Sequence, residues 1–225
     1  MRRFRRRNRT NNQNLSMGKK SKDVVELWVY KILLNLNGHR DFLDNVRGIR
    51  DDDLAYFLGL DKFVDNYEDK DKKEIFGLMK NRLETLKSKE VYKLPKTLNR
   101  NMKRVTSLIN LSKVEKDILI FIIYLKYFDI MDSATRMLND LSTDRLVTIL
   151  SVLLDYKKPK IKTALSPQAK LGQSGLVTVD RDGTNSLLNK VDILSRDFAD
   201  KMMNLNGDIE EMIKDSVRRC TPAER

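Results

Sequence analysis

The stretch LGQSGLVTVDRDG, residues 171–183, predicts how the second half of this chain folds. Gly175 is expected to end a helix, the LVTV segment to form a short strand, and Asp182-Gly183 to make a second turn. A helix followed by a small twisted hairpin is the ending of a winged helix. The stretch therefore predicts a winged-helix-like subdomain, and with it the hypothesis that the chain contacts DNA.

Segments upstream of this stretch extend the winged-helix prediction over about residues 112–189. Ser112 and Glu115 form a capping-box signature ahead of VEKDILIFIIYLKYF, which is apolar around most of its circumference and is expected to be central. A shorter helix over 132–139 leads into the helix DRLVTILSVLLDY. A basic connection and a helix in SPQAKLGQSG then lead to the predicted strand.

The first half of the chain is expected to be helical. Ser21 is positioned to cap a helix that buries the only tryptophan, Trp28. Short helices follow over 40–68, and apolar residues at steps of three and four predict an amphipathic helix over 72–92. Pro95 separates this helix from the next one.

The predicted fold class is mainly α, with a helical N-terminal subdomain followed by a winged-helix-like subdomain that carries a small β-hairpin. Two helices, at 197–203 and 208–217, are expected to close the chain. The predicted organisation is a basic tail over 1–20, a helical subdomain over 21–92, a winged-helix-like subdomain over 93–190, and closing helices with a linker over 191–225.

The positive charge is concentrated at one end of the chain. Residues 1–20 contain eight arginines and lysines and no acid, so they supply 8 of the net charge of +12 and leave +4 on the rest. Such a segment cannot bury apolar surface, and we expect it to be disordered and to bind polyanions in a salt-dependent way. A start at Met17 would remove most of this signal.

Cysteine content and hydropathy indicate a cytoplasmic protein. Cys220 is the only cysteine, which forbids an internal disulfide and fits a reducing compartment. The longest apolar run, residues 118–125, is far shorter than the roughly 20 residues that cross a bilayer. We therefore expect no membrane partner.

Motifs for catalysis are missing. The chain has no GxxxxGK[ST] loop, and its single His39 and Cys220 exclude zinc cages and Ser-His or Cys-His pairs. The densest acidic group, residues 51–53, suits a helix N-terminus better than a shared ion, because consecutive residues point in different directions. We expect no catalytic residue, cofactor or metal; a magnesium-dependent enzyme is the weakest alternative.

The helix over 143–156 is too apolar to read bases, since a recognition helix needs polar side chains along its outer face. It is expected to be covered, by its own domain and by a partner protein. The candidates for partner docking are Leu146, Leu150 and Leu153, together with Trp28 on the first helix. The alternative for these residues is core packing.

Basic residues keep a nucleic-acid alternative open, since they would contact phosphates without reading sequence. A solvated face is the simpler interpretation of the same residues. The candidates are Arg145, Lys157, Lys158, Lys160, Lys162, Lys170 and Arg181.

A resemblance to a known family enters at residues 91–219. The first part of the resemblance is KLP at 93–95 with Leu98 and Asn101. The second part is formed by Leu111, Ser112, Glu115, Leu119 and Phe121. The segments LSTDRLVTIL and LSPQAKLGQSGLVTVD follow. In order and spacing this resembles the region upstream of the ATPase module in certain bacterial AAA+ ATPases.

The resemblance implies a non-catalytic N-terminal region that recruits substrates or adaptors, or contacts the ATPase core. It departs from the family in one respect, because the chain ends at Arg225, where the ATPase module should begin. No catalytic residue of the family is carried over. The sequence leaves open whether the chain is a fragment of a longer ATPase or a stand-alone accessory protein. It also does not determine the oligomeric state or the identity of the partner.

Overall fold

The computed structural model describes residues 17–44, 48–65, 67–88 and 93–205. The chain is mainly helical, with two small antiparallel sheets. Its first half contains α2 (Lys19–Tyr30), the π-helical turn η1 (Lys31–Asn35), α3 (His39–Phe42), β1 (Leu43–Asp44), β2 (Gly48–Ile49), α4 (Asp52–Phe57), the 3₁₀ turn η2 (Asp61–Phe63) and α5 (Asp71–Lys87). Its second half contains α6 (Lys96–Ile109), α7 (Lys113–Tyr127), α8 (Asp129–Arg136), α9 (Thr143–Leu153), α10 (Lys158–Ala164), α11 (Lys170–Gln173), β3 (Val177–Val179), α12 (Leu187–Lys190), β4 (Val191–Ile193) and α13 (Arg196–Asn204).

The helices predicted for the first half are present, with one change at the start. α2 begins at Lys19 with Gly18 as its N-cap residue, so Ser21 does not cap it. Ser21 is instead buried, and its Oγ lies 3.4 Å from the hydroxyl oxygen of Tyr124. The capping role expected for the acidic group at 51–53 is confirmed, because the Asp51 side chain accepts a hydrogen bond from the N–H of Leu54.

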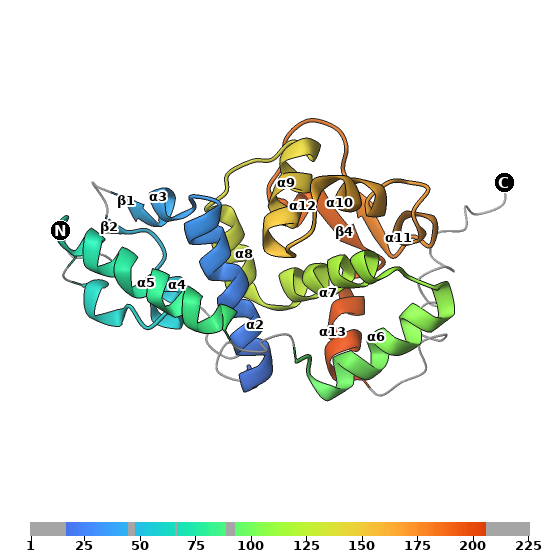
Figure 1. Ribbon diagram of the computed structural model, residues 1–225, viewed down its shortest axis with the longest axis horizontal. Helices are drawn as coiled ribbons and strands as arrows, with labels where there is room; N and C mark the ends of the chain where they lie inside the picture. The colour runs from blue at the N-terminus through green and yellow to red at the C-terminus, as the bar shows by residue number, and fades with distance from the viewer. Residues whose placement is uncertain (1–16, 45–47, 66, 89–92, 206–225) are drawn as a thin grey trace.

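α7 is the central helix, as its apolar circumference predicts. It contacts α6, α8, α10, α11, α13 and β4, and Figure 1 shows it between the upper and lower helices of the second half. The predicted capping box is confirmed. The Ser112 hydroxyl accepts a hydrogen bond from the Glu115 N–H, and the Glu115 carboxylate accepts one from the Ser112 N–H.

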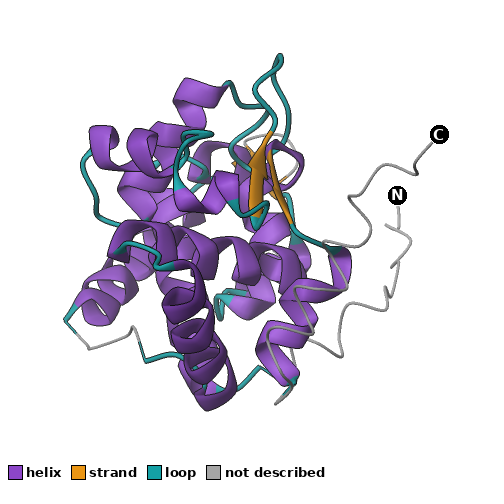
Figure 2. Cartoon of the chain, turned by 90° about the vertical axis from the view of Figure 1, so that its right-hand side faces the viewer, coloured by secondary structure: helices purple, strands orange, loops and turns teal. Residues whose placement is uncertain are grey.

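The connection between the two strands of the predicted hairpin is longer than the sequence indicated. β3 pairs with β4 in the register Val177↔Ile193 and Val179↔Val191, so its partner strand lies well beyond the turn at Asp182-Gly183. Gly183 does adopt a left-handed conformation, but α12 follows before the chain returns as a strand. Figure 2 shows this sheet beside the helices, and it joins the predicted subdomain of 93–190 to residues assigned to the closing segment.

The basic connection that the sequence predicted is instead a helix, because residues 158–164 form α10. Pro159 lies in the first turn, where its missing N–H costs no helical hydrogen bond. The helix expected in SPQAKLGQSG is reduced to the four residues of α11. Of the closing helices, the one at 197–203 is confirmed as α13, while the one at 208–217 lies outside the described residues.

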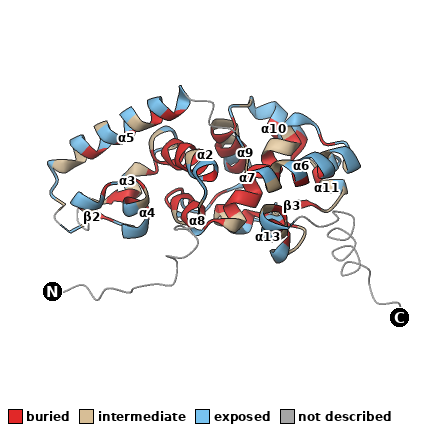
Figure 3. Cartoon of the chain, turned by 90° about the horizontal axis from the view of Figure 1, so that it is seen from below, coloured by how far each residue is buried: buried red, intermediate tan, exposed pale blue. Residues whose placement is uncertain are grey.

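A single buried apolar core extends through both halves of the chain. Trp28 of α2 meets Phe121 and Tyr124 of α7 edge-to-face, with ring centroids 5.2 and 5.4 Å apart. Figure 3 shows the buried positions gathered where α2, α7, α8 and α9 face one another. None of the helices in the described ranges has both the length and the apolar character that spanning a bilayer requires.

Candidate functional site

The predicted docking leucines lie inside the protein. Leu146, Leu150 and Leu153 are at most 1% exposed, because α10, α12 and η1 cover α9. They form no accessible apolar surface, and the alternative of core packing is the correct one for them. The apolar character of α9 is therefore explained by the chain's own packing.

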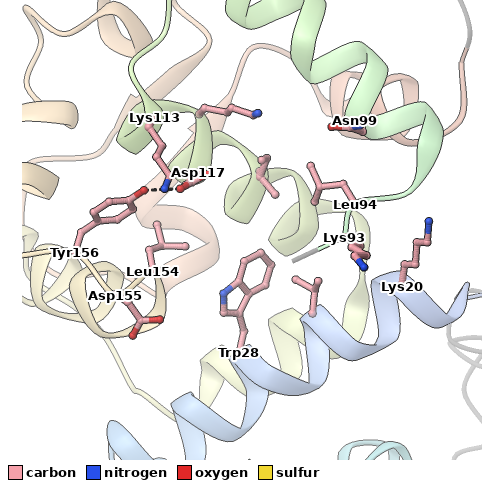
Figure 4. A pocket seen from close by; sticks show the side chains of 13 residues that line it. Lys20, Trp28, Lys93, Leu94, Asn99, Lys113, Asp117, Leu154, Asp155 and Tyr156 are labelled. Atoms are coloured by element: carbon pink, nitrogen blue, oxygen red, sulfur yellow. Dashed lines mark hydrogen bonds between the residues drawn. The ribbon is translucent and has the colours of Figure 1, made fainter. Parts of the chain in front are cut away.

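Trp28 is also buried, at 1% exposed, but it lies at the edge of a cleft of about 720 Å³. The cleft is bounded by α2, the segment leading into α6, the first turns of α7 and the end of α9 (Figure 4). Its lining residues are Lys20, Val24, Trp28, Lys93, Leu94, Asn99, Lys113, Lys116, Asp117, Ile120, Leu154, Asp155 and Tyr156.

The lining of the cleft divides into apolar and charged parts. Five apolar side chains, including Trp28, are joined by the four lysines at positions 20, 93, 113 and 116. Of the two carboxylates, Asp117 accepts a 2.6 Å hydrogen bond from the Tyr156 hydroxyl, and Asp155 is paired with Lys31. The cleft thus carries an excess of positive charge.

The indole nitrogen of Trp28 is a buried donor, and no described residue accepts its hydrogen bond. Figure 4 shows the indole rising from α2 into the space between α7 and the end of α9. A buried N–H without a partner costs roughly 1–3 kcal/mol, so most such groups in proteins are satisfied. This donor is the most unusual polar group of the cleft.

Lys31 holds one wall of the cleft in place. Its side chain is 3% exposed, and Nζ donates to the carbonyl oxygen of Leu153 at 3.0 Å and to the Asp155 carboxylate at 2.6 Å. A cation at the last carbonyls of a helix is favourable, and Asp155 itself adopts a left-handed conformation that ends α9. This contact fixes the end of α9 against η1.

The basic candidates lie on a second surface, formed by α10. Ile161 and Ala164 face the core, while the lysines at 157, 158, 160 and 162 are exposed. Arg145 is exposed near the start of α9. The structure therefore places four predicted phosphate contacts on the outer side of a helix and its N-cap, rather than along an extended connection.

Two other basic candidates are engaged by backbone carbonyls. Lys170 Nζ donates to the carbonyl oxygen of Asn110 at 2.6 Å, and the Arg181 guanidinium donates to that of Leu165 at 2.7 Å. These contacts give both side chains a structural role.

Glu115, in the first turn of α7, is buried against α11. Its carboxylate accepts hydrogen bonds from the backbone N–H groups of Ser112, Lys170 and Leu171. Burial raises the pKa of this carboxyl, but the hydrogen bonds outweigh burial and hold the pKa below its ordinary value. Glu115 remains ionised and links α7 to α11.

Sequence reasoning missed the polar residues of the cleft. Lys113, Lys116 and Asp117 are spaced so that they share one side of the first turns of α7, a signal that was present in the sequence. Tyr156 and Lys93 reach the cleft from segments distant in sequence, so no local pattern would have found them. Within the described ranges, no group of His, Cys, Asp and Glu side chains is arranged to hold a metal ion.

Comparisons with protein-family models, with curated proteins and with solved structures gave no match to this chain.

Proposed function

We propose that this chain is a non-catalytic protein-binding module of the kind that precedes the ATPase core in bacterial AAA+ machines, and that the cleft beside Trp28 receives its partner. The cleft carries this proposal, because it combines an apolar floor with convergent polar groups, as binding sites do. The module would act in the cytoplasm, in line with a single cysteine and no internal disulfide.

The residues that carry the family resemblance support this proposal through their structural roles. Asn101 is fully buried, and its amide donates to the carbonyl oxygens of Met202 and Leu205 at 3.1 and 2.8 Å, which anchors the end of α13. Glu115 joins α7 to α11. Both residues hold neighbouring elements in fixed positions before a partner binds, which lowers the entropic cost of binding, as a recruiting module requires.

The element order also supports a winged-helix interpretation of the second half. α7 is followed by the bridge between Leu141 and Asn185, then by α9, α10 and the β3–β4 pair. In this interpretation α10, and not α9, takes the position of the recognition helix. That assignment fits the buried leucines of α9.

Photocrosslinking tests the proposed function. A benzophenone amino acid placed at Lys116, in the cleft, is expected to crosslink a protein with an AAA+ ATPase core or a substrate of one, in cells that make the full chain. The same group at Lys158, on α10, is the matched control. The purified crosslinked protein must then bind the unmodified chain in calorimetry; equal crosslinking from both positions, or none from Lys116, would contradict the proposal.

A second candidate function is binding to nucleic-acid phosphates through α10. The observation that favours it is the exposed row of lysines on α10 and its N-cap. Phosphate contacts weaken steeply with salt, whereas apolar docking does not, so the salt dependence separates the two functions.

A further inference from the structure

We propose that the cleft beside Trp28 binds an acidic, partly apolar peptide segment of the partner protein. This inference rests on the proposed function and specifies the chemistry of the partner. It follows from three features of the cleft: its charge, its apolar floor and its buried donor.

The charge of the cleft favours a negatively charged ligand. Lysines 20, 93, 113 and 116 come from three different elements and line one opening. Among the described lining residues, four lysines accompany two carboxylates, and one of these, Asp155, is paired with the buried Lys31. Carboxylates of a bound segment would complement this charge.

The apolar floor favours a peptide over a nucleic acid. Leu94 is partly exposed in the lining, and the almost fully buried Val24 and Ile120 complete the apolar floor, so Leu94 would contact aliphatic side chains of a bound segment. A nucleic-acid strand carries phosphates without such aliphatic side chains, so it would leave the apolar floor without a matching partner. Alternating acidic and apolar residues match the lining better.

The Trp28 indole N–H is a buried donor at the edge of the cleft, so a bound segment reaches it only after the side chains that cover it shift. It lacks an acceptor among the described residues, and a carbonyl or carboxylate oxygen of a bound segment would satisfy it. Trp28 is also the only tryptophan of the chain, so tryptophan emission reports on this one residue, which lies between the core and the cleft.

The experiment titrates a short peptide of alternating Glu and Leu into the full chain and follows Trp28 emission. Its counterpart with Gln in place of Glu is the matched probe. We expect the Glu peptide to shift the emission and to bind more weakly as salt increases, because the ion pairs are screened. The double variant Lys113→Gln/Lys116→Gln should bind about fivefold to tenfold more weakly, the size expected for two partly exposed ion pairs.

The control variant Lys158→Gln/Lys160→Gln removes the same charge from α10 and should leave peptide affinity unchanged. Circular dichroism of both double variants checks that they fold. Equal affinity for the Glu and Gln peptides would overturn the acidic specificity while leaving partner docking intact. No binding of either peptide, or displacement of the Glu peptide by an oligonucleotide, would overturn the inference; the proposed function itself fails only on the crosslinking result from Lys116.

Discussion

The carboxylate of Glu115 accepts a 2.8 Å hydrogen bond from the backbone N–H of Lys170, although the two residues are 55 positions apart in the sequence. The same carboxylate completes the capping box of α7 with Ser112. One buried side chain therefore satisfies the N-terminal N–H groups of two helices, α7 and α11. This contact sets the position of α11 and of the strand that follows it.

Glu115→Gln should lower the free energy of unfolding by ~1–3 kcal/mol, because the amide nitrogen cannot accept the hydrogen bonds that one carboxylate oxygen accepts now. Urea denaturation followed by circular dichroism measures this change. Glu84→Gln is the matched control, since Glu84 is 62% exposed on α5, where it pairs with Lys87. A similar cost for both variants would mean that Glu115 has no special structural role.

The lowered pKa of Glu115 predicts a pH dependence of stability. The folded state holds the carboxylate ionised more strongly than the unfolded state does, so its contribution is complete above the ordinary glutamate pKa and is lost as the pH falls through the folded pKa. The stability difference between wild type and Glu115→Gln should therefore shrink as the pH falls below the ordinary glutamate pKa. Denaturation midpoints across a pH series measure it, and a constant difference would contradict the assignment.

Lys31→Met should destabilise the protein by ~1–3 kcal/mol, because it keeps the side-chain volume but leaves the Leu153 carbonyl without its buried donor. Asp155→Asn should cost less than ~1 kcal/mol, since Asp155 is 69% exposed and asparagine tolerates its left-handed backbone. Urea denaturation of both variants measures the difference. If Asp155→Asn costs as much as Lys31→Met, the ion pair and not the carbonyl contact holds the end of α9.

The α10 lysines predict the salt dependence of any DNA binding. We expect a chain that starts at Met17 to bind duplex DNA only weakly at physiological salt. The triple variant Lys158→Gln, Lys160→Gln and Lys162→Gln should reduce the salt slope by about 0.9 for each phosphate that these lysines neutralise in the wild type. Fluorescence anisotropy across a salt series measures both quantities.

The full chain and the double variant Lys113→Gln/Lys116→Gln are the controls for this series. If only the full chain binds DNA, residues 1–16 carry the whole signal. Strong binding by the Met17 chain that the triple variant abolishes would favour the second candidate function over protein docking.

Several elements could be predicted because their signals are local. The capping box at Ser112, the amphipathic helix α5 and the apolar helix α7 depend on residues a few positions apart, and all three are present. α10 was missed because a lysine-rich segment has the composition of a connection. Its packing on α9 and α7, with Ile161 and Ala164 buried, stabilises it as a helix.

The candidate site could be predicted only in part. Trp28 was identified from the sequence, but the leucines of α9 were not distinguishable from a docking surface, because burial depends on which elements cover a helix. Of the lysines of the cleft, Lys93, Lys113 and Lys116 were not singled out from the sequence, and Lys20 was placed in the basic tail. Their convergence depends on α2, α6 and α7 meeting at one place.

The sequence by itself determined the mainly helical fold class, the caps of α4 and α7, and the apolar character of α7 and α9, since these depend on propensity and apolar periodicity over neighbouring residues. The tertiary structure decided the pairing of β3 with β4, the bond from Glu115 to α11, and the cleft beside Trp28. Each of these joins residues far apart in the chain, so its free energy comes from long-range packing and hydrogen bonding that no local pattern encodes.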